Sequence, residues 1–305
     1  MSAHHFLFYP TRMFHSLGAW TVLVVLVFVY VCFKVASSTR RQSVDKDPDA
    51  VEQTKQRESH SDSTTNLKQP YDAFLVLDVE ATCKQGSSFD YPNEIIEFPV
   101  CLMKWNDEKR SELVIVDEFR SFVKPSWRPT ITEFCEHLTG ITQSQVDNAP
   151  SFPQALQSVS QFLTKHGLLE EHTDGPFDVR DFVVKACFIN QIPIPAWLRG
   201  DVIDINSMVT DWSIMQNNRG RKMRAKLARN HPHRPRLNIR SQLRVLGLSP
   251  FEGREHSGID DARNIARIVA ECARRNICLR PNTTINPNRR WYWMGKSGQV
   301  LFQDE

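Results

Sequence analysis

The sequence predicts an α/β fold, in which a mixed sheet carries helices on its faces and an apolar helix precedes the folded part. Three strand-like segments come first in the folded part, and five helical patterns follow them. Strands followed by helices around one core are typical of this layered architecture. The third observation is an uncharged stretch near the N-terminus, residues 17–33.

The stretch from residue 17 to residue 33 reads LGAWTVLVVLVFVYVCF, which is near the minimum length for a membrane-spanning helix. Trp20 and Tyr30 stand where aromatic side chains favour the two membrane interfaces. More positive charge follows the stretch than precedes it, which orients the rest of the chain toward the cytosol. We therefore expect a membrane anchor with a cytosolic body. The alternatives for this stretch are a cleaved signal peptide, a misassigned start of translation or, least favoured, a buried core helix, and the alternative location is a soluble protein of the cytoplasm or nucleus.

Four regions follow from the composition along the chain. Residues 1–36 contain the apolar stretch, and residues 37–69 are polar and charged with few large aliphatic side chains. Such a segment buries too little apolar surface to offset its chain entropy, so we expect a disordered linker. Residues 70–280 form the predicted folded domain, and residues 281–305 form a C-terminal tail.

The predicted sheet begins with a continuous apolar run, Ala73 to Leu77, which suits a strand that is buried on both faces. The second strand lies between Glu94 and Met103, and the third between Val114 and Val123, before Pro125. Short polar loops join the three, so an antiparallel meander is the simplest arrangement.

The predicted helices have apolar residues at the spacing of a helix face. The first begins at Ser151, a suitable cap, and ends near Gly167. Its apolar stripe contains Ala155, Leu156, Val159, Phe162 and Leu163. The others run from Phe177 to Gln191, Arg199 to Met215, Ile239 to Leu246 and Ile259 to Arg275.

Cysteine usage and net charge limit the class of protein. The seven cysteines show no Cys-x-x-Cys pair and no Cys/His spacing of a zinc site, so we expect reduced thiols and no structural zinc. A net charge of +3 for the whole chain does not by itself indicate a nucleic-acid partner. No small-molecule cofactor motif is present in the sequence.

Asp78 and Glu80 follow the first apolar run and are two residues apart, so on a strand their side chains point to the same face. Two carboxylates beside a buried strand are costly unless a cation joins them. Hard divalent cations prefer oxygen ligands, and two such ions stabilise a phosphodiester under attack. The alternative is a strand end that reaches solvent and carries two ordinary surface acids.

Asp261 and His256 lie at the start of the last predicted helix. A carboxylate in the first helical turn suits the helix dipole, and Asp261 borders the apolar stripe of its helix, which makes it a candidate ligand. Asp260 faces elsewhere and is a candidate cap. His256 stands in a glycine-flanked loop, and an ordinary histidine pKa of about 6.5 suits a general base near neutral pH. A loop histidine is more often simply exposed.

Five segments, taken together, resemble the DEDDh 3′–5′ exonucleases of the ribonuclease H-like superfamily, and more closely the histone-mRNA exonuclease and enhancer-of-RNAi family. The resemblance covers about residues 71–280, and its motifs occur in the family's order. They are FLVLDVEATC, NEIIEFPV, FCEHLTGIT, TDGPFDVRDF and GREHSGIDDARNIARI.

The resemblance implies a ribonuclease H-like fold and a two-metal 3′–5′ exoribonuclease that releases nucleoside 5′-monophosphates from RNA with a free 3′ end. It implies two Mg²⁺ or Mn²⁺ ions and His256 as general base. Glu80, Ala81 and His256 would contact the terminal nucleotide. The implied metal ligands are Asp78, Glu80, Asp178 and Asp261.

The segment before Asp178, GLLEEHTDGPFD, departs from the family, which has an apolar strand at this place. Either a short piece has been lost from the gene model or the fold is damaged there. In the second case the chain would be a non-catalytic protein that only binds RNA. A DNA 3′–5′ exonuclease is a further alternative, because its catalytic residues would be the same.

Residues 219–240 hold nine Lys and Arg and no acid, and we expect this basic insertion to contact RNA through its phosphates. A solvated insertion or a nuclear signal is the alternative. In the tail, residues Arg289 to Met294 place three aromatic side chains directly after two arginines. We favour packing of these aromatics on the domain over stacking on bases.

Overall fold

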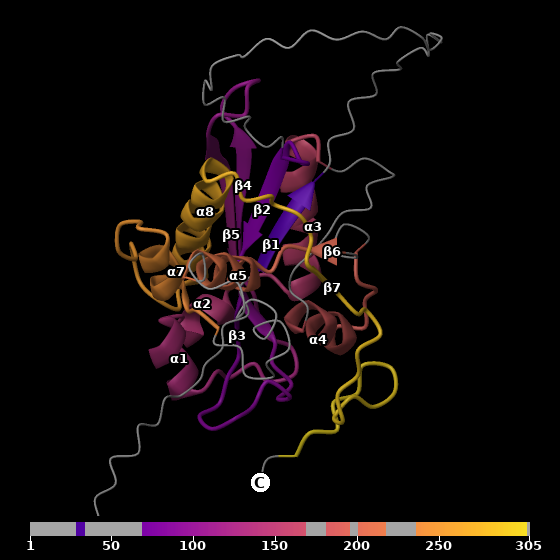
Figure 1. The fold of residues 1–305 in the computed structure, drawn as a ribbon. Helices are drawn as coiled ribbons and strands as arrows, with labels where there is room; N and C mark the ends of the chain where they lie inside the picture. Colours follow the sequence, from indigo (N-terminus) through magenta and orange to yellow (C-terminus); the bar gives the residue numbers. More distant parts are fainter. Residues whose placement is uncertain (1–28, 34–68, 169–180, 196–200, 218–235, 304–305) are drawn as a thin grey trace, which may run out of the picture.

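A sheet of five strands forms the centre of the described part of this computed structural model, which comprises residues 29–33, 69–168, 181–195, 201–217 and 236–303 (Figure 1). The strand order is β1-β2-β4-β3, and β5 pairs with the other side of β4. All of these pairs are antiparallel, which confirms the predicted meander of β2, β4 and β5. The strands are β1 (Val29–Phe33), β2 (Ala73–Leu77), β3 (Glu80–Ala81), β4 (Ile95–Trp105) and β5 (Leu113–Phe122).

Strand β1 corrects the prediction of a membrane helix over residues 17–33. Residues Val29–Phe33 are extended and pair with β2, with Val31 opposite Leu75. No helix within the described ranges combines the length and apolarity needed to span a bilayer. The physical reason is that an uninterrupted apolar run fits a membrane helix or a strand, and Val, Tyr and Phe favour strands. Residues 17–28 lie outside the described part.

Side chains of β2 alternate between two apolar cores, as expected for a strand that is buried on both faces. Ala73, Leu75 and Leu77 belong to the first core, and Phe74 and Val76 to the second. Val79 and Ala81 continue the first set beyond the end of β2. The alternation therefore directs the intervening side chains toward the second core.

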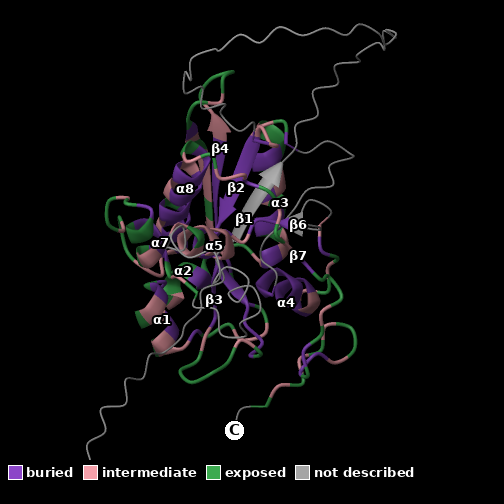
Figure 2. Ribbon diagram, in the orientation of Figure 1, coloured by how far each residue is buried: buried purple, intermediate pink, exposed green. Residues whose placement is uncertain are grey.

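Helices cover both faces of the sheet (Figure 1). The first core is closed by α3 (Phe152–Lys165), α4 (Phe182–Ile189) and part of the C-terminal tail. The second is closed by α5 (Ile205–Asn217), α7 (Ile239–Val245) and α8 (Gly258–Arg274). Figure 2 shows buried residues along β2 and along the side of α8 that faces the sheet. These layers confirm the expected sheet with helices on its faces, but the predicted sheet was mixed, whereas every strand pair among the described residues is antiparallel.

The predicted helix boundaries hold where capping residues mark them. Ser151 and Gln154 form a capping box at the start of α3. Asn238 caps α7 by accepting a hydrogen bond from the backbone of Ser241. Helix α4 is shorter than expected, and residues 177–180 of that prediction lie outside the described ranges. Helix α5 begins six residues later than expected, after the short strand β6 (Asp201–Val202), which pairs with β7 (Thr283–Thr284).

Two short helices, α1 (Glu133–Thr139) and α2 (Gln143–Asp147), were not predicted. Thr132 and Thr142 cap them, and Gly140 between them adopts a φ of 72°, which favours glycine. They bury a separate small core against β4, with Ile96 and Cys135 among its members. Their brevity leaves almost no helical periodicity for sequence reasoning to detect.

Candidate active site

Asp78 and Glu80 lie at the interruption between β2 and β3, next to β4. Both side chains are buried. Because Val79 and Ala81 enter the first core, the two carboxylates lie on the opposite face, toward α8. The register pairs Glu80 with Glu97 of β4, so a third acid lies directly opposite Glu80 on the neighbouring strand.

Asp261 reaches the same place from the first turn of α8 and is buried. The start of α8 packs directly on the strand, since a Cβ on Gly258 would lie 2.5 Å from the carbonyl oxygen of Asp78. A glycine is therefore needed at this contact. The structure thus brings Asp78, Glu80 and Asp261 to the interface between β2, β3 and α8. Asp178 lies outside the described ranges.

The buried acids repel one another. Burial, followed by the charges of Asp261 and Glu97, raises the pKa of Glu80 well above its ordinary value. Burial likewise raises the pKa of Asp261 to about 8. Oε1 of Glu80 is buried and has no hydrogen-bond partner among the described residues. The two raised pKa values and the oxygen without a hydrogen-bond partner indicate that the described side chains supply too little positive charge to balance these carboxylates.

Oxygen donors without counter-charge fit a hard divalent cation. Across the described residues, no three His, Cys, Asp or Glu side chains gather closely enough to form a metal-ion site. Asp178, the fourth expected ligand, is not among the residues compared there. The donor chemistry of Glu80 and Asp261 thus fits a divalent ion, although the described side chains alone do not enclose one.

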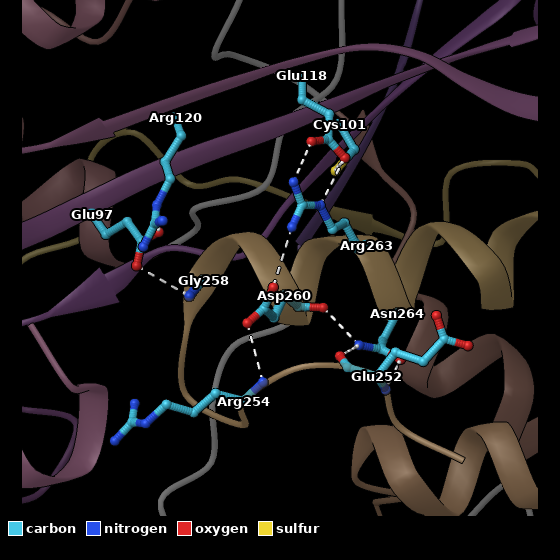
Figure 3. A network of polar contacts seen from close by, with 10 residues as sticks. All are labelled: Glu97, Cys101, Glu118, Arg120, Glu252, Arg254, Gly258, Asp260, Arg263 and Asn264. Atoms are coloured by element: carbon cyan, nitrogen blue, oxygen red, sulfur yellow. Dashed lines mark hydrogen bonds and ion pairs between the residues drawn. The ribbon is translucent and has the colours of Figure 1, made fainter. Parts of the chain in front are cut away.

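Glu97 was not singled out from the sequence, yet it joins three elements of the site (Figure 3). It is fully buried, accepts a hydrogen bond of 2.7 Å from Arg120 Nε of β5, and accepts one of 3.1 Å from the backbone N–H of Gly258. Its signal in the sequence is an acid inside the apolar strand segment NEIIEFPV. Such a residue is costly unless it is paired, so it marks a specific interaction.

The loop that carries His256 is fastened to its surroundings (Figure 3). The side chain of Asn264 accepts from the backbone N–H of Glu252 and donates to its carbonyl oxygen, over 3.0 and 2.7 Å. The backbone N–H of Arg254 donates to Asp260 over 3.1 Å, and its guanidinium donates to two carbonyl oxygens at the end of α1. Asp260 therefore holds the loop, whereas the sequence had suggested that it caps the helix.

His256 itself adopts a φ of 63°, which is uncommon for a residue with a side chain. Its backbone N–H donates to Asp261 Oδ2 over 2.8 Å, which fixes the loop against the carboxylate. Burial lowers the pKa of the half-buried imidazole below its ordinary value. Its Nδ1 has no hydrogen-bond partner among the described residues. The lowered pKa favours the neutral imidazole, which is the form that can accept a proton.

Ala81 and the basic insertion are the two remaining predicted contacts, and only the insertion is partly outside the described residues. Ala81 is buried beside the acids, and Cys135 Sγ of α1 lies 3.7 Å from its carbonyl oxygen. Of the basic insertion, residues 219–235 lie outside the described ranges. Arg240, at its end, pairs with Glu255 in the His256 loop. The end of the basic insertion therefore adjoins the candidate site.

Comparison with known sequences shows that this chain is similar to exonucleases. A sequence model of a protein family described as Exonuclease matches residues 75–269. The chain is 34% identical to the 3'-5' exonuclease eri1 of Schizosaccharomyces pombe, over 82% of each chain. It is 31% identical to the human 3'-5' exoribonuclease 1 over 70% of this chain, and the match spans 55% of the human protein.

Solved structures with a similar fold include two exonucleases. One is the nuclease domain of 3'hExo, a DEDDh family member bound to rAMP, with 28% identity and a TM-score of 0.53 over 68% of this chain and 94% of that one. Another shows recognition of a histone mRNA stem-loop by a 3'-exonuclease, with 26% identity and a TM-score of 0.58 over 73% and 71% of the two chains.

Proposed function

This chain belongs to the exonuclease family that its sequence matches over residues 75–269, and we propose that it shortens RNA from a free 3′ end. Hydrolysis of nucleic acid from the 3′ end, with divalent metal ions, follows from this membership. We infer that its products are nucleoside 5′-monophosphates. The observation that carries the proposal is the meeting of buried acids from β3 and α8 beside the His256 loop.

We propose that the acids of this site hold two Mg²⁺ or Mn²⁺ ions through Asp78, Glu80, Asp178 and Asp261. The raised pKa values of Glu80 and Asp261 support this assignment, because they reflect buried carboxylates without enough positive charge nearby. Divalent ions bound there would supply the charge that stabilises the phosphodiester during attack and departure of the leaving oxygen.

His256 is the proposed general base, which takes a proton from the attacking water. Its lowered pKa supports this role, because a base must be neutral before it accepts a proton. Its hydrogen-bonded backbone supports the role as well, since Asp261 holds the loop at a fixed distance from the acids. Glu80, Ala81 and His256 are the proposed contacts of the 3′-terminal nucleotide.

The experiment combines purified full-length protein with RNA that carries a label at its 5′ end, in Mg²⁺ or Mn²⁺. A 3′–5′ exonuclease produces a ladder that shortens from the unlabelled end. We expect Glu80→Gln and Asp78→Asn to lower the rate by at least about 100-fold, since metal charge contributes several kcal/mol to such reactions. Glu108→Gln, in an exposed turn, is the matched control and should retain the rate.

Each result has a defined meaning. A Glu80→Gln protein that trims RNA at the normal rate would remove Glu80 from the catalytic residues. A normal protein that binds RNA in Mg²⁺ and Mn²⁺ but never shortens it would support the non-catalytic RNA-binding alternative. A matched DNA strand in the same assay separates the RNA exonuclease from the DNA exonuclease.

A further inference from the structure

The described surface contains a groove of 470 Å³ between the loop that follows β3 and the end of the C-terminal tail. We call it the tail groove. One wall comes from the loop that follows Ala81, and the other comes from the tail. Its lining residues are Lys84, Gln85, Gly86, Ser87, Tyr91, Tyr292, Leu301, Phe302 and Gln303.

The tail wall is part of the folded domain. Trp293 is fully buried, and its indole N–H donates to the carbonyl oxygen of Asp90 in the loop wall. The rings of Trp291 and Trp293 stack at 6.2 Å, and the backbone of Leu301 donates to Trp293 over 2.8 Å. These contacts confirm the expected packing of the tail aromatics and fix the tail against the loop.

A buried lysine holds the loop wall of the tail groove in place. Lys185 of α4 is fully buried and donates to the carbonyl oxygens of Phe89 and Tyr91 and to Asn93 Oδ1. Asn93 in turn donates to the carbonyl oxygen of Thr82, directly after β3. Both walls of the tail groove are therefore held in place by the fold, which lowers the cost of ordering a bound ligand.

Tyr292 is the exception among the tail aromatics. Its neighbours Trp291 and Trp293 are buried, whereas 74% of Tyr292 is exposed. Its ring centroid lies 6.4 Å from that of Phe302, which contacts Tyr91 at 5.2 Å. The tail groove thus presents an exposed aromatic ring that is backed by a rigid aromatic cluster.

The lining chemistry selects a class of ligand. Of the nine lining residues, one is a cation, Lys84, and none is an acid. Aromatic rings beside a cation bind single-stranded nucleic acid, because every base offers a flat face and every linkage a negative charge. Lys84 follows Glu80 by four residues, so their Cα atoms are at most about 14 Å apart, within reach of a short strand that enters the active site.

We propose that the tail groove binds a base of the RNA strand a few nucleotides upstream of the 3′ end, with Tyr292 stacked on that base and Lys84 near its phosphate. This subsite rests on the proposed exoribonuclease function. It makes the enzyme prefer RNA that is long enough to reach from the active site to Tyr292 over the shortest substrates.

The test compares kcat/KM for octauridylate and for the dinucleotide UpU. In Tyr292→Ala, the preference for the longer RNA should fall roughly tenfold, as expected for loss of one stacked base. Tyr292→Phe should keep the preference, because it keeps the ring. Val116→Ala, at an exposed position of β5 outside the tail groove, is the matched surface control. An unchanged preference in Tyr292→Ala, or an equal loss in Tyr292→Phe, overturns the proposal.

Binding of labelled octauridylate in EDTA separates this proposal from the proposed function. Binding that weakens roughly tenfold in Tyr292→Ala supports the tail groove even if the normal protein shortens no RNA. Equal binding by the two proteins overturns it even if the protein is an active exonuclease. The melting temperature of Tyr292→Ala should match that of the normal protein, and a large decrease would indicate a structural role instead.

Discussion

The backbone N–H of Gly258 donates a hydrogen bond of 3.1 Å to Glu97 Oε2, which ties the first residue of α8 to β4. The other carboxylate oxygen of Glu97 pairs with Arg120 of β5 over 2.7 Å. A carboxylate at a helix N-terminus is favourable because the helix dipole is positive there. Since Asp261 lies three residues after Gly258, this contact sets the position of Asp261 relative to Asp78 and Glu80.

Gly258→Ala should disrupt the approach of α8 to the strand. The added Cβ would lie 2.5 Å from the backbone carbonyl oxygen of Asp78, with Pro99 Cγ at 3.1 Å and Glu97 Oε2 at 3.3 Å, which leaves little room to adjust. We expect a loss of about 1–3 kcal/mol of stability, typical of overpacking, and a large fall in exonuclease rate because Asp261 moves with the helix. Thermal unfolding and RNA trimming measure the two effects.

Ser257→Ala is the control for Gly258→Ala, because Ser257 stands at the N-cap of α8 without a side-chain cap hydrogen bond. It should change stability and rate only slightly. A Gly258→Ala protein with the melting temperature and trimming rate of the normal protein would show that the strand and helix do not need this close contact.

Glu97→Ala should separate α8 from β4 without touching a proposed metal ligand. The substitution leaves the N–H of Gly258 buried without its acceptor and removes the partner of Arg120, so we expect a loss of about 1–3 kcal/mol. Urea unfolding measures the loss, and Glu112→Ala, at an exposed position before β5, is the comparison. Equal unfolding midpoints for Glu97→Ala and the normal protein would show that Glu97 does not stabilise the contact between α8 and β4.

Asp117 of β5 supplies a pH-dependent contribution to stability away from the active site. Hydrogen bonds from Lys165 and then His166 at the end of α3 lower the pKa of Asp117 to about 2. Because the folded-state pKa lies below the unfolded one, the stabilisation is complete above about pH 4 and disappears as the pH falls toward 2. Solvent screens this half-buried cluster, so the effect is small.

The measurement for Asp117 is the difference in urea midpoint between the normal protein and Asp117→Asn across this pH range. The normal protein should be more stable at pH 5, and the difference should shrink steadily toward pH 2. A difference that stays constant as the pH falls would mean that the Asp117 carboxylate and its partners do not stabilise the fold.

Sequence reasoning located the elements whose patterns are long and regular. The alternation of β2, the stripe of α3 and the start of α8 were all predictable, because burial imposes a period on the side chains. The apolar N-terminal stretch was misread because it has no period to interpret. Val29–Phe33 became an edge strand of the sheet, a tertiary pairing that local sequence does not encode.

The acids of the candidate site could be singled out from the sequence, because Asp78 and Glu80 follow an apolar run and Asp261 borders the apolar stripe of α8. The contacts that support the site could not. The role of Glu97 depends on an N–H that lies 161 positions later in the chain, and the Arg254 guanidinium reaches a helix end 117 positions earlier. The tail groove likewise combines residues near 85 with residues near 300. Such contacts follow from the packing of distant segments.

Asp261→Asn tests the metal assignment without an activity assay. In EDTA at pH 7 the substitution removes a buried carboxyl group whose raised pKa forces it to take up a proton on folding, so the metal-free protein should be more stable than the normal one by about 1–2 kcal/mol. In the normal protein, Mn²⁺ at about 100 times its Kd should add about 2.7 kcal/mol of stability, because it binds only the folded state. Asp261→Asn should lose most of that increase. Asp260→Asn is the matched control, since Asp260 holds Arg254 and Arg263 and is not a proposed metal ligand, and it should keep the metal response. If Mn²⁺ raises the melting temperature of Asp261→Asn as much as that of the normal protein, Asp261 does not bind the ion.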